Sequence, residues 1–270
     1  MSMMRNDMVD AVNTLGRFCG MRDVPALTPD ALKGALGTPQ ADVMVLFGGS
    51  ILCGGDVLAQ AIRDGVARRY IIVGGEGHTT QSLRDRVHAL CPEIPTDGQP
   101  EAVVFAAWLE RTHGLSVDAL ECRSTNCGNN ITNLLDLLRE RAFPCRSIIL
   151  TQDATMQRRM DATMQRRMDA GLRLHAPQLR IVNYASYRAT LVPGPDGPVF
   201  DGDIPGMWDV ERYVTLLMGE IPRLSPAGYG LQGKGYIAHV EIPDAVRSAF
   251  AFLQARCPGL VREANPLYAY

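Results

Sequence analysis

The chain has 270 residues, of which 46% are hydrophobic and 21% are charged, and its formal net charge is −2. This is an ordinary globular composition, and the near-neutral charge argues against a nucleic-acid-binding surface, which usually needs a positive excess. No apolar stretch approaches the roughly 20 residues that span a bilayer, and the first twenty residues are too polar for a signal peptide. We therefore expect a cytoplasmic protein that binds neither nucleic acid nor membranes.

Cysteine and histidine patterns bear on metal and disulfide chemistry. The seven cysteines are scattered and never spaced CxxC, and the five histidines form no HxH or HExxH pattern. The sequence therefore predicts neither a disulfide framework nor a metal site.

Strands and helices alternate along the first 190 residues. Continuous apolar runs, typical of strands buried on both faces, occur at 41–50, 68–75, 117–122, 145–153 and 179–187. Helical patterns occur twice within 8–37, where Thr28 is a plausible N-cap before Pro29, and then at 56–67, 100–114 and 130–143. This alternation predicts an α/β fold with a doubly wound, mostly parallel Rossmann-like sheet and helices on both faces.

The character of the chain changes after residue 190. Residues 191–206 are rich in Pro, Gly and Asp and predict an excursion between elements. Helices are predicted at 207–224, with Trp208, Tyr213, Leu216 and Leu217 on a buried face, and at 242–257, on either side of a glycine-rich loop at 227–236. We expect a Rossmann-like domain over 1–190, including the N-terminal helices within 1–37, and a smaller, mainly helical part over 191–270.

Ligands of open α/β sheets bind beyond the carboxyl ends of the strands. The loops at those ends are 48–55, 74–80, 123–130 and 152–158. Glycines there let the backbone approach a ligand, and helix N-termini attract anions. The predicted ligand-binding residues, which include the first residue of one helix, are Gly48, Gly49, Ser50, Gly74, Gly75, Glu76, Gly77, Thr79, Glu101, Ser124, Thr125, Asn126, Asn130, Gln152, Thr155 and Arg158.

Two residues of these loops are candidate catalytic groups. His78 can act as an acid or base near neutral pH, and Asp153 directly follows a buried strand. Arg158 is placed to hold a carboxylate or phosphate through two hydrogen bonds. Cys127 suggests a nucleophile, but no histidine stands at a recognisable spacing from it.

The octapeptide DATMQRRM occurs twice in succession, at 153–160 and 161–168. Eight residues advance a helix by two turns plus roughly 80°, and by about 12 Å along its axis. The second copy therefore cannot present its side chains as the first does, so we expect Arg158 to bind the ligand and Arg166 not to. Methionines recur every four residues and predict an apolar packing stripe, formed by Met156, Met160, Met164 and Met168.

Several of these segments together resemble one family. They are GGEGHTT (74–80), EAVVFAAW (101–108), STNCGNN (124–130), QDATMQRR (152–159), WDVERYVTLLMGEIPRL (208–224) and GYGLQGKGYIAHVEIP (228–243). They look like the YdcF-like proteins of the SanA/ElyC/YdcF group, bacterial proteins of unknown function, over about residues 40–245. The resemblance implies a Rossmann-like domain with a small helical C-terminal part, a cytoplasmic location and binding of S-adenosyl-L-methionine. Only the first TMQRR keeps the family's form.

Several functions fit these features. We expect an enzyme whose cleft binds S-adenosylmethionine or a similar nucleotide-like ligand, with Arg158 on its carboxylate and Asp153 or Glu101 on its ribose hydroxyls. A methyltransferase is one version, although the usual glycine-rich first loop with an acidic residue ending the second strand is missing. Alternatives are a hydrolase or transferase acting on a phosphate-bearing substrate, with His78 as the acid–base group, and a non-enzymatic metabolite sensor that signals through the C-terminal part. Sparse histidines argue against a metal-dependent hydrolase.

Overall fold

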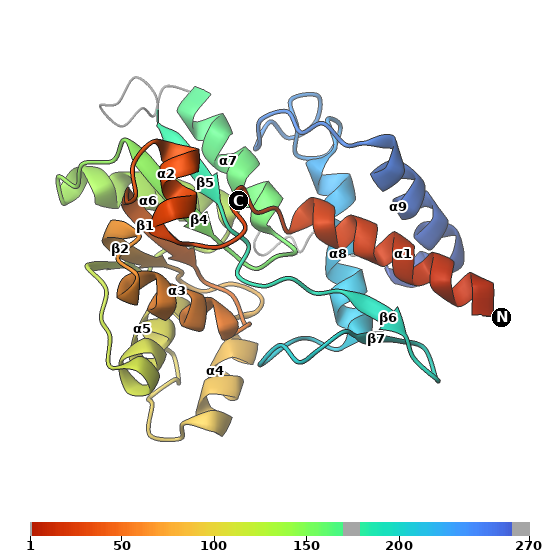
Figure 1. Cartoon of the computed structure of the whole chain (residues 1–270), viewed down its shortest axis with the longest axis horizontal. Coiled ribbons are helices and arrows are strands. Elements are labelled where there is room, and N and C mark those ends of the chain that lie inside the picture. Colours follow the sequence, from red (N-terminus) through yellow and green to blue (C-terminus); the bar gives the residue numbers. More distant parts are fainter. Residues whose placement is uncertain (1, 170–178, 261–270) are drawn as a thin grey trace.

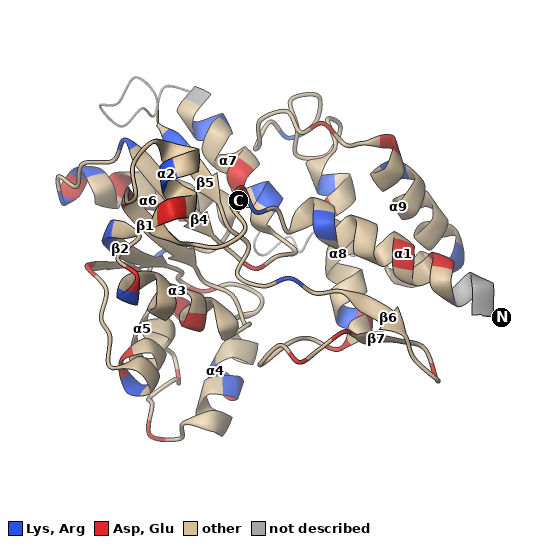
Figure 2. Ribbon diagram, viewed as in Figure 1, with Lys and Arg blue, Asp and Glu red and all other residues tan. Residues whose placement is uncertain are grey.

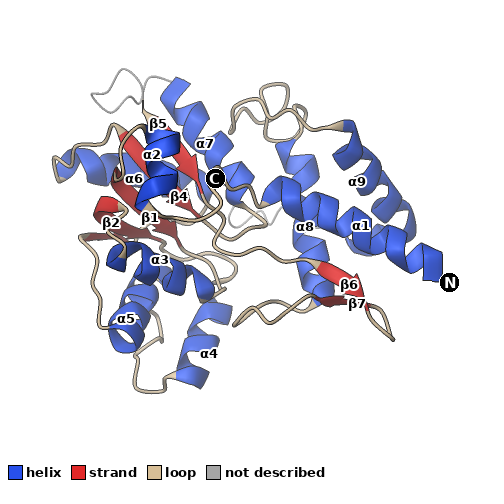
Figure 3. Ribbon diagram, viewed as in Figure 1, coloured by secondary structure: helices blue, strands red, loops and turns tan. Residues whose placement is uncertain are grey.

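The structure is a computed structural model that describes residues 2–169 and 179–260. Figures 1 and 3 show its helices and strands. The helices are α1 (Ser2–Cys19), α2 (Pro29–Leu36), α3 (Cys53–Arg63), α4 (Thr80–Leu90), α5 (Glu101–His113), α6 (Cys127–Glu140), α7 (Gln157–Asp169), α8 (Val210–Leu224), α9 (Asp244–Arg256) and the 3₁₀ turn Pro258–Leu260. The strands are β1 (Ala41–Phe47), β2 (Ala67–Val73), β3 (Ala119–Glu121), β4 (Ser147–Thr151), β5 (Arg180–Asn183), β6 (Leu191–Pro193) and β7 (Pro198–Phe200).

The central sheet confirms the predicted fold class. Across the described ranges, β1 to β5 form one parallel sheet in the order β3-β2-β1-β4-β5. The chain lays β2 and β3 on one side of β1 and then crosses over to place β4 and β5 on the other side. At such a reversal the connections after β1 and β4 diverge and leave a crevice at the carboxyl ends of these two strands.

Both faces of the sheet are covered by helices, which explains the continuous apolar strands. Along β1, Met44 and Leu46 pack in the core beneath α2, α3, α4 and α5. The alternate residues Val43, Val45 and Phe47 pack on the opposite face, against α6 and α7. Successive strand residues point to opposite faces, and helices bury both faces. The strands are therefore apolar throughout and show no period-two alternation of polarity.

Local signals fixed several element ends. The Thr28 hydroxyl accepts a hydrogen bond from the backbone N–H of Ala31 at 3.3 Å, which confirms the predicted cap of α2. The α6 helix begins at Cys127 rather than at residue 130, because the side-chain oxygen of Asn126 accepts the backbone N–H of Asn129 at 2.9 Å. The excursion at 191–206 contains an antiparallel hairpin of β6 and β7, which the sequence did not predict.

The N-terminal helix packs with the C-terminal part. Val12 and Leu15 of α1 are buried in the same core as Tyr213 and Leu217 of α8 and Leu253 of α9. Figure 1 shows α1 crossing α8 and α9, beside the sheet rather than on it. The predicted division at residue 190 grouped α1 with the sheet, whereas its apolar face is buried by elements from the other end of the chain.

Charged residues are interspersed over both parts of the molecule in Figure 2. None of the helices in the described ranges is long and apolar enough to cross a bilayer. Within the same ranges, His, Cys, Asp and Glu side chains form no group of three that could hold a metal ion.

Candidate functional site

A cavity of about 120 Å³ lies at the carboxyl ends of the strands, around the crevice between β1 and β4. One buried water needs only about 10–15 Å³ by this measure, so the cavity has room for a ligand group. Most predicted site residues line it, which brings together loops that are far apart in the chain. They are Gly48, Gly49, Ser50, Gly75, Gly77, His78, Thr79, Glu101, Ser124, Thr125, Asn126, Asn130, Gln152, Asp153 and Thr155.

The structure places three predicted residues outside the cavity lining. Gly74 lies beneath Glu101, where an added Cβ would be 3.0 Å from that residue's own Cβ. Glu76 is exposed and pairs with Arg84 at 3.1 Å. The Arg158 guanidinium turns toward α1, where its Nε donates to the carbonyl of Phe18 and its Cζ lies 4.2 Å from the centre of the Phe18 ring. Arg158 therefore joins two helices instead of facing a ligand.

Arg159, and not Arg158 as predicted from the sequence, is the arginine of α7 that faces the cavity. Successive helical residues are rotated by about 100°, so only one of these two adjacent arginines can face the cavity. Arg159 lines the cavity and makes a side-on ion pair with Glu220 of α8, with Nε–Oε2 at 2.6 Å and Nη2–Oε1 at 3.0 Å. The pair is buried, with side-chain exposures of 14% and 6%. This ion pair uses the Nε–Nη2 edge of the guanidinium, so the Nη1 edge faces away from Glu220.

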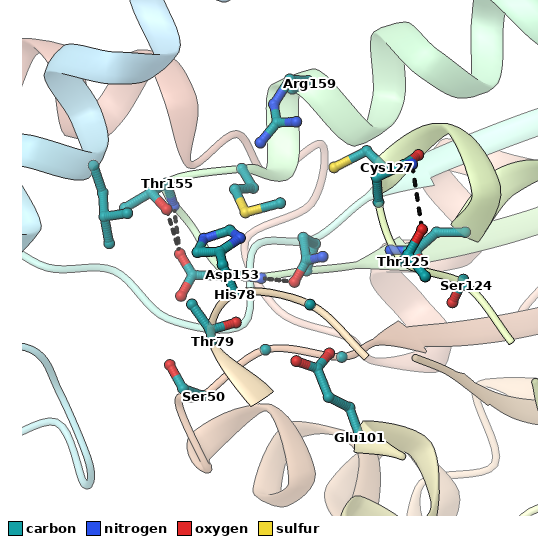
Figure 4. Close-up of a pocket in the computed structure, with 18 of the residues that line it drawn as sticks. Ser50, His78, Thr79, Glu101, Ser124, Thr125, Cys127, Asp153, Thr155 and Arg159 are labelled. Carbon is teal, nitrogen blue, oxygen red and sulfur yellow. Dashed lines mark hydrogen bonds between the residues drawn. The ribbon is translucent and has the colours of Figure 1, made fainter. Parts of the chain in front are cut away.

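The Asp153 carboxylate is held by one oxygen. Its Oδ1 accepts the Thr155 backbone N–H at 2.8 Å, the Thr155 hydroxyl at 2.7 Å and the Tyr187 hydroxyl at 2.8 Å. All three bonds go to the same oxygen, and the Asp153 side chain lines the cavity (Figure 4). Burial raises the pKa of Asp153, while the hydrogen bonds from Thr155 and Tyr187 lower it. Because these bonds fix Oδ1, Oδ2 is the oxygen suited to accept a proton, or a hydrogen bond from a ligand hydroxyl.

Glu101 is a buried carboxyl group at the floor of the cavity. It begins α5 and its side chain rises into the cavity in Figure 4. The Thr80 hydroxyl donates to its Oε1 at 2.8 Å, and Gly48 makes room for it, because any Cβ at that position would collide with Oε2. Burial raises the pKa of Glu101 to about 7, against the lowering effect of the Thr80 and Thr79 hydroxyls. A group with this pKa can give and take a proton near neutral pH.

The loops after β2 and β3 meet on the other side of the cavity. A Cβ at Gly75 would collide with the carbonyl oxygen of Ser124, so only glycine allows this approach. The Ser124 hydroxyl accepts the backbone N–H of Gly75 at 3.2 Å. Cys127 follows in α6, and burial raises the pKa of its thiol. A buried thiol that stays protonated is a poor nucleophile, so a catalytic role for Cys127 has no support here.

The C-terminal part forms one wall of the cavity, although none of its residues was predicted to belong to the site. Trp208, Leu216, Glu220, Arg223 and Tyr229 all line it. A signal was present in the chain, because Leu216, Glu220 and Arg223 have the spacing i, i+4, i+7 and so lie on one helix face. Ionisable residues that continue a buried apolar stripe must find partners inside the protein.

The second octapeptide does more than lengthen α7. Arg166 stands outside the cavity lining, as expected for its place along the helix, but its Nε donates to the carbonyl of Gly235 at 3.1 Å. The carbonyl of Ala162 accepts the backbone N–H of Ala238 at 2.9 Å. The second copy thus holds the glycine-rich loop that carries Tyr229. Met160 and Met164 are fully buried, which confirms the core of the predicted methionine stripe.

The cavity therefore combines a fixed carboxylate, a carboxyl group able to exchange protons, an oriented guanidinium and an aromatic wall. Figure 4 shows Asp153 and Thr155 on one side, Ser124 and Cys127 on the other, and Arg159 across from Glu101. Such a set can bind a polar small molecule and assist proton transfer on it. No protein-family model matches this chain.

Proposed function

We propose that this protein is a cytoplasmic enzyme that binds S-adenosylmethionine, or a similar nucleotide-like molecule, in the cavity between the ends of β1 and β4. The observation that carries this proposal is the juxtaposition of Glu101 and Asp153 in one cavity at the reversal point of the sheet. Two carboxyl groups with different environments are a recurrent arrangement for dividing acid and base roles.

The cavity residues match the groups of such a ligand. Oδ2 of Asp153 can accept hydrogen bonds from the ribose hydroxyls, and the Nη1 edge of Arg159 can hold a carboxylate while Glu220 keeps the guanidinium in place. Trp208 and Tyr229 provide aromatic side chains against which a nucleobase can pack. Arg159 thus replaces Arg158 as the proposed carboxylate-binding residue.

The buried position of the Glu101 carboxyl group favours an enzyme over a binding module. Placing a carboxyl group in a buried position is costly unless it is paired or protonated, and no Lys or Arg of the described ranges forms an ion pair with Glu101. We assign Glu101 the proton-transfer role in the proposed reaction, with Asp153 holding the substrate. His78, also in the lining, is a further acid–base candidate.

S-adenosylmethionine is expected to raise the melting temperature of the wild-type protein, because a ligand that binds only the native state stabilises it by mass action. Asp153→Asn should weaken binding by about tenfold or more, as for loss of a hydrogen bond to a charged group. Calorimetric titration of both proteins measures this effect. Asp97→Asn is the matched control, since Asp97 is exposed and outside the cavity lining. Unchanged melting at saturating S-adenosylmethionine would contradict the proposal.

The metabolite-sensor alternative draws on a specific observation, because the cavity is lined by both the sheet and α8. A ligand there could shift α8 through the Arg159–Glu220 pair. Incubation with labelled S-adenosylmethionine separates the two functions. An enzyme consumes the ligand in the presence of a cell-extract cosubstrate and loses that activity in Glu101→Gln, whereas a sensor returns it unchanged.

A further inference from the structure

Two polar atoms of the cavity lining are buried and have no hydrogen-bond partner among the residues that the structure describes. They are the hydroxyl of Ser50, a residue that is 1% exposed, and the indole Nε1 of Trp208. A buried polar group without a partner costs roughly 1–3 kcal/mol, so a ligand that supplies the partner gains that energy. An indole N–H can only donate, which means that the missing partner at Trp208 is an acceptor.

Ser50 stands three residues before the start of α3, where the partial positive charge of the helix dipole favours anions. The first N–H groups of α3 are not available to a ligand, because those of Gly54 and Gly55 donate to the carbonyls of Ile51 and Leu52 at 3.4 and 2.8 Å. The Ser50 hydroxyl and the Trp208 indole thus present donors from two separate segments, and α3 adds only the field of its dipole.

Arg86 of α4 brings a positive charge to this corner. Its Nη1 donates to the Ser50 carbonyl, and its Cζ lies 5.5 Å from the centre of a Trp208 ring. In the described ranges no carboxylate forms an ion pair with Arg86, and burial lowers the pKa of its guanidinium without an opposing carboxylate contribution. Arg86 is outside the cavity lining. It contacts both donor residues and places a positive charge next to them.

We propose that the corner formed by Ser50 and Trp208, next to Arg86 and near the start of α3, binds an anionic oxygen group of the ligand, a carboxylate or a phosphate. This inference rests on the proposed function in that it names a group of the molecule bound in the same cavity. S-adenosylmethionine has one carboxylate, which the proposed function gives to Arg159, so a second anion-binding corner selects the nucleotide-like alternative, a ligand that carries a further carboxylate or a phosphate.

The test uses inorganic phosphate and acetate as probes. The chain has two tryptophans, so Trp108→Phe leaves Trp208 as the sole indole and makes its fluorescence a reporter. Phosphate or acetate, at an ionic strength matched with chloride, is expected to change this emission with saturation. The probe with the higher affinity identifies the group. Ser50→Ala in this background should weaken the preferred anion by about tenfold or more, as for a lost hydrogen bond to a charged group.

Matched variants control for the loss of a buried donor as such. Within the described part of the chain, the Thr151 hydroxyl and the Trp108 Nε1 are also buried and without hydrogen-bond partners, but both residues are outside the cavity lining. Thr151→Val should therefore leave anion affinity unchanged, and in thermal shift assays Trp108→Phe should retain the anion effect that Trp208→Phe loses. Equal losses in Ser50→Ala and Thr151→Val, or no saturable response to either anion, would overturn the inference. S-adenosylmethionine binding that still depends on Asp153 would then leave the proposed function standing.

Discussion

Replacing Glu101 by Gln is expected to stabilise the unliganded protein above pH 7 and to have little effect on stability below pH 4.5. Burial raises the pKa of Glu101 from 4.5 to about 7 in the folded state. Because the pKa of Glu101 is higher in the folded than in the unfolded state, its contribution to the free energy of unfolding is fully present below pH 4.5 and is lost as the pH rises to about 7. Glutamine resembles the protonated acid and does not ionise, so the variant escapes this loss.

The size of the effect follows from the shift. A difference of this extent between the folded and unfolded pKa corresponds to roughly 3 kcal/mol in the free energy of unfolding. Urea denaturation of both proteins across this pH range measures it, since the other titrating groups cancel in the difference. Glu110→Gln, at an exposed position of the same helix α5, is the control and should change stability by about 0.5 kcal/mol or less. A difference between Glu101→Gln and wild type that does not vary with pH would contradict the assigned pKa.

Removing the Glu220 carboxylate is expected to destabilise the protein by about 3–5 kcal/mol, because Arg159 would remain as a buried charge without its partner. The two side chains are only 14% and 6% exposed and are joined by two hydrogen bonds. The pair also connects α7 of the sheet domain to α8. Thermal and urea denaturation of Glu220→Ala measure the loss.

An exposed ion pair provides the comparison. Arg111 and Glu93 are joined at 2.6 Å, but their side chains are 60% and 50% exposed, so Glu93→Ala should lower the stability far less than Glu220→Ala does. Arg223 is also buried and lies 3.8 Å from Glu220. The triple variant Arg159→Met/Glu220→Leu/Arg223→Leu removes all three charges of this cluster and should recover much of the stability lost in Glu220→Ala. If Glu220→Ala cost no more than Glu93→Ala, the pair would not be buried as described.

The order of elements and the cavity loops could be predicted because they depend on short-range patterns. Apolar runs marked the strands, Thr28 marked a helix start, and the glycines of 48–49 and 74–77 marked strand ends. Parallel strands bring their carboxyl ends to one edge of the sheet, so loops distant in the chain could be assigned to one site before any contact was known. The predicted start of α6 at residue 130 was wrong, because the Asn126 side chain caps the helix three residues earlier.

Side-chain direction and the partners of the C-terminal part depended on the tertiary structure. Arg158 and Arg159 are indistinguishable by composition, and the rotation of α7 against α1 and α8 decided that Arg159 faces the cavity while Arg158 contacts Phe18. The sequence by itself determined which strand-end loops form the sheet side of the site. Only the packing of α1, α8 and the glycine-rich loop decided which charges are buried there, because burial and pairing arise between segments whose separation along the chain carries no periodic signal.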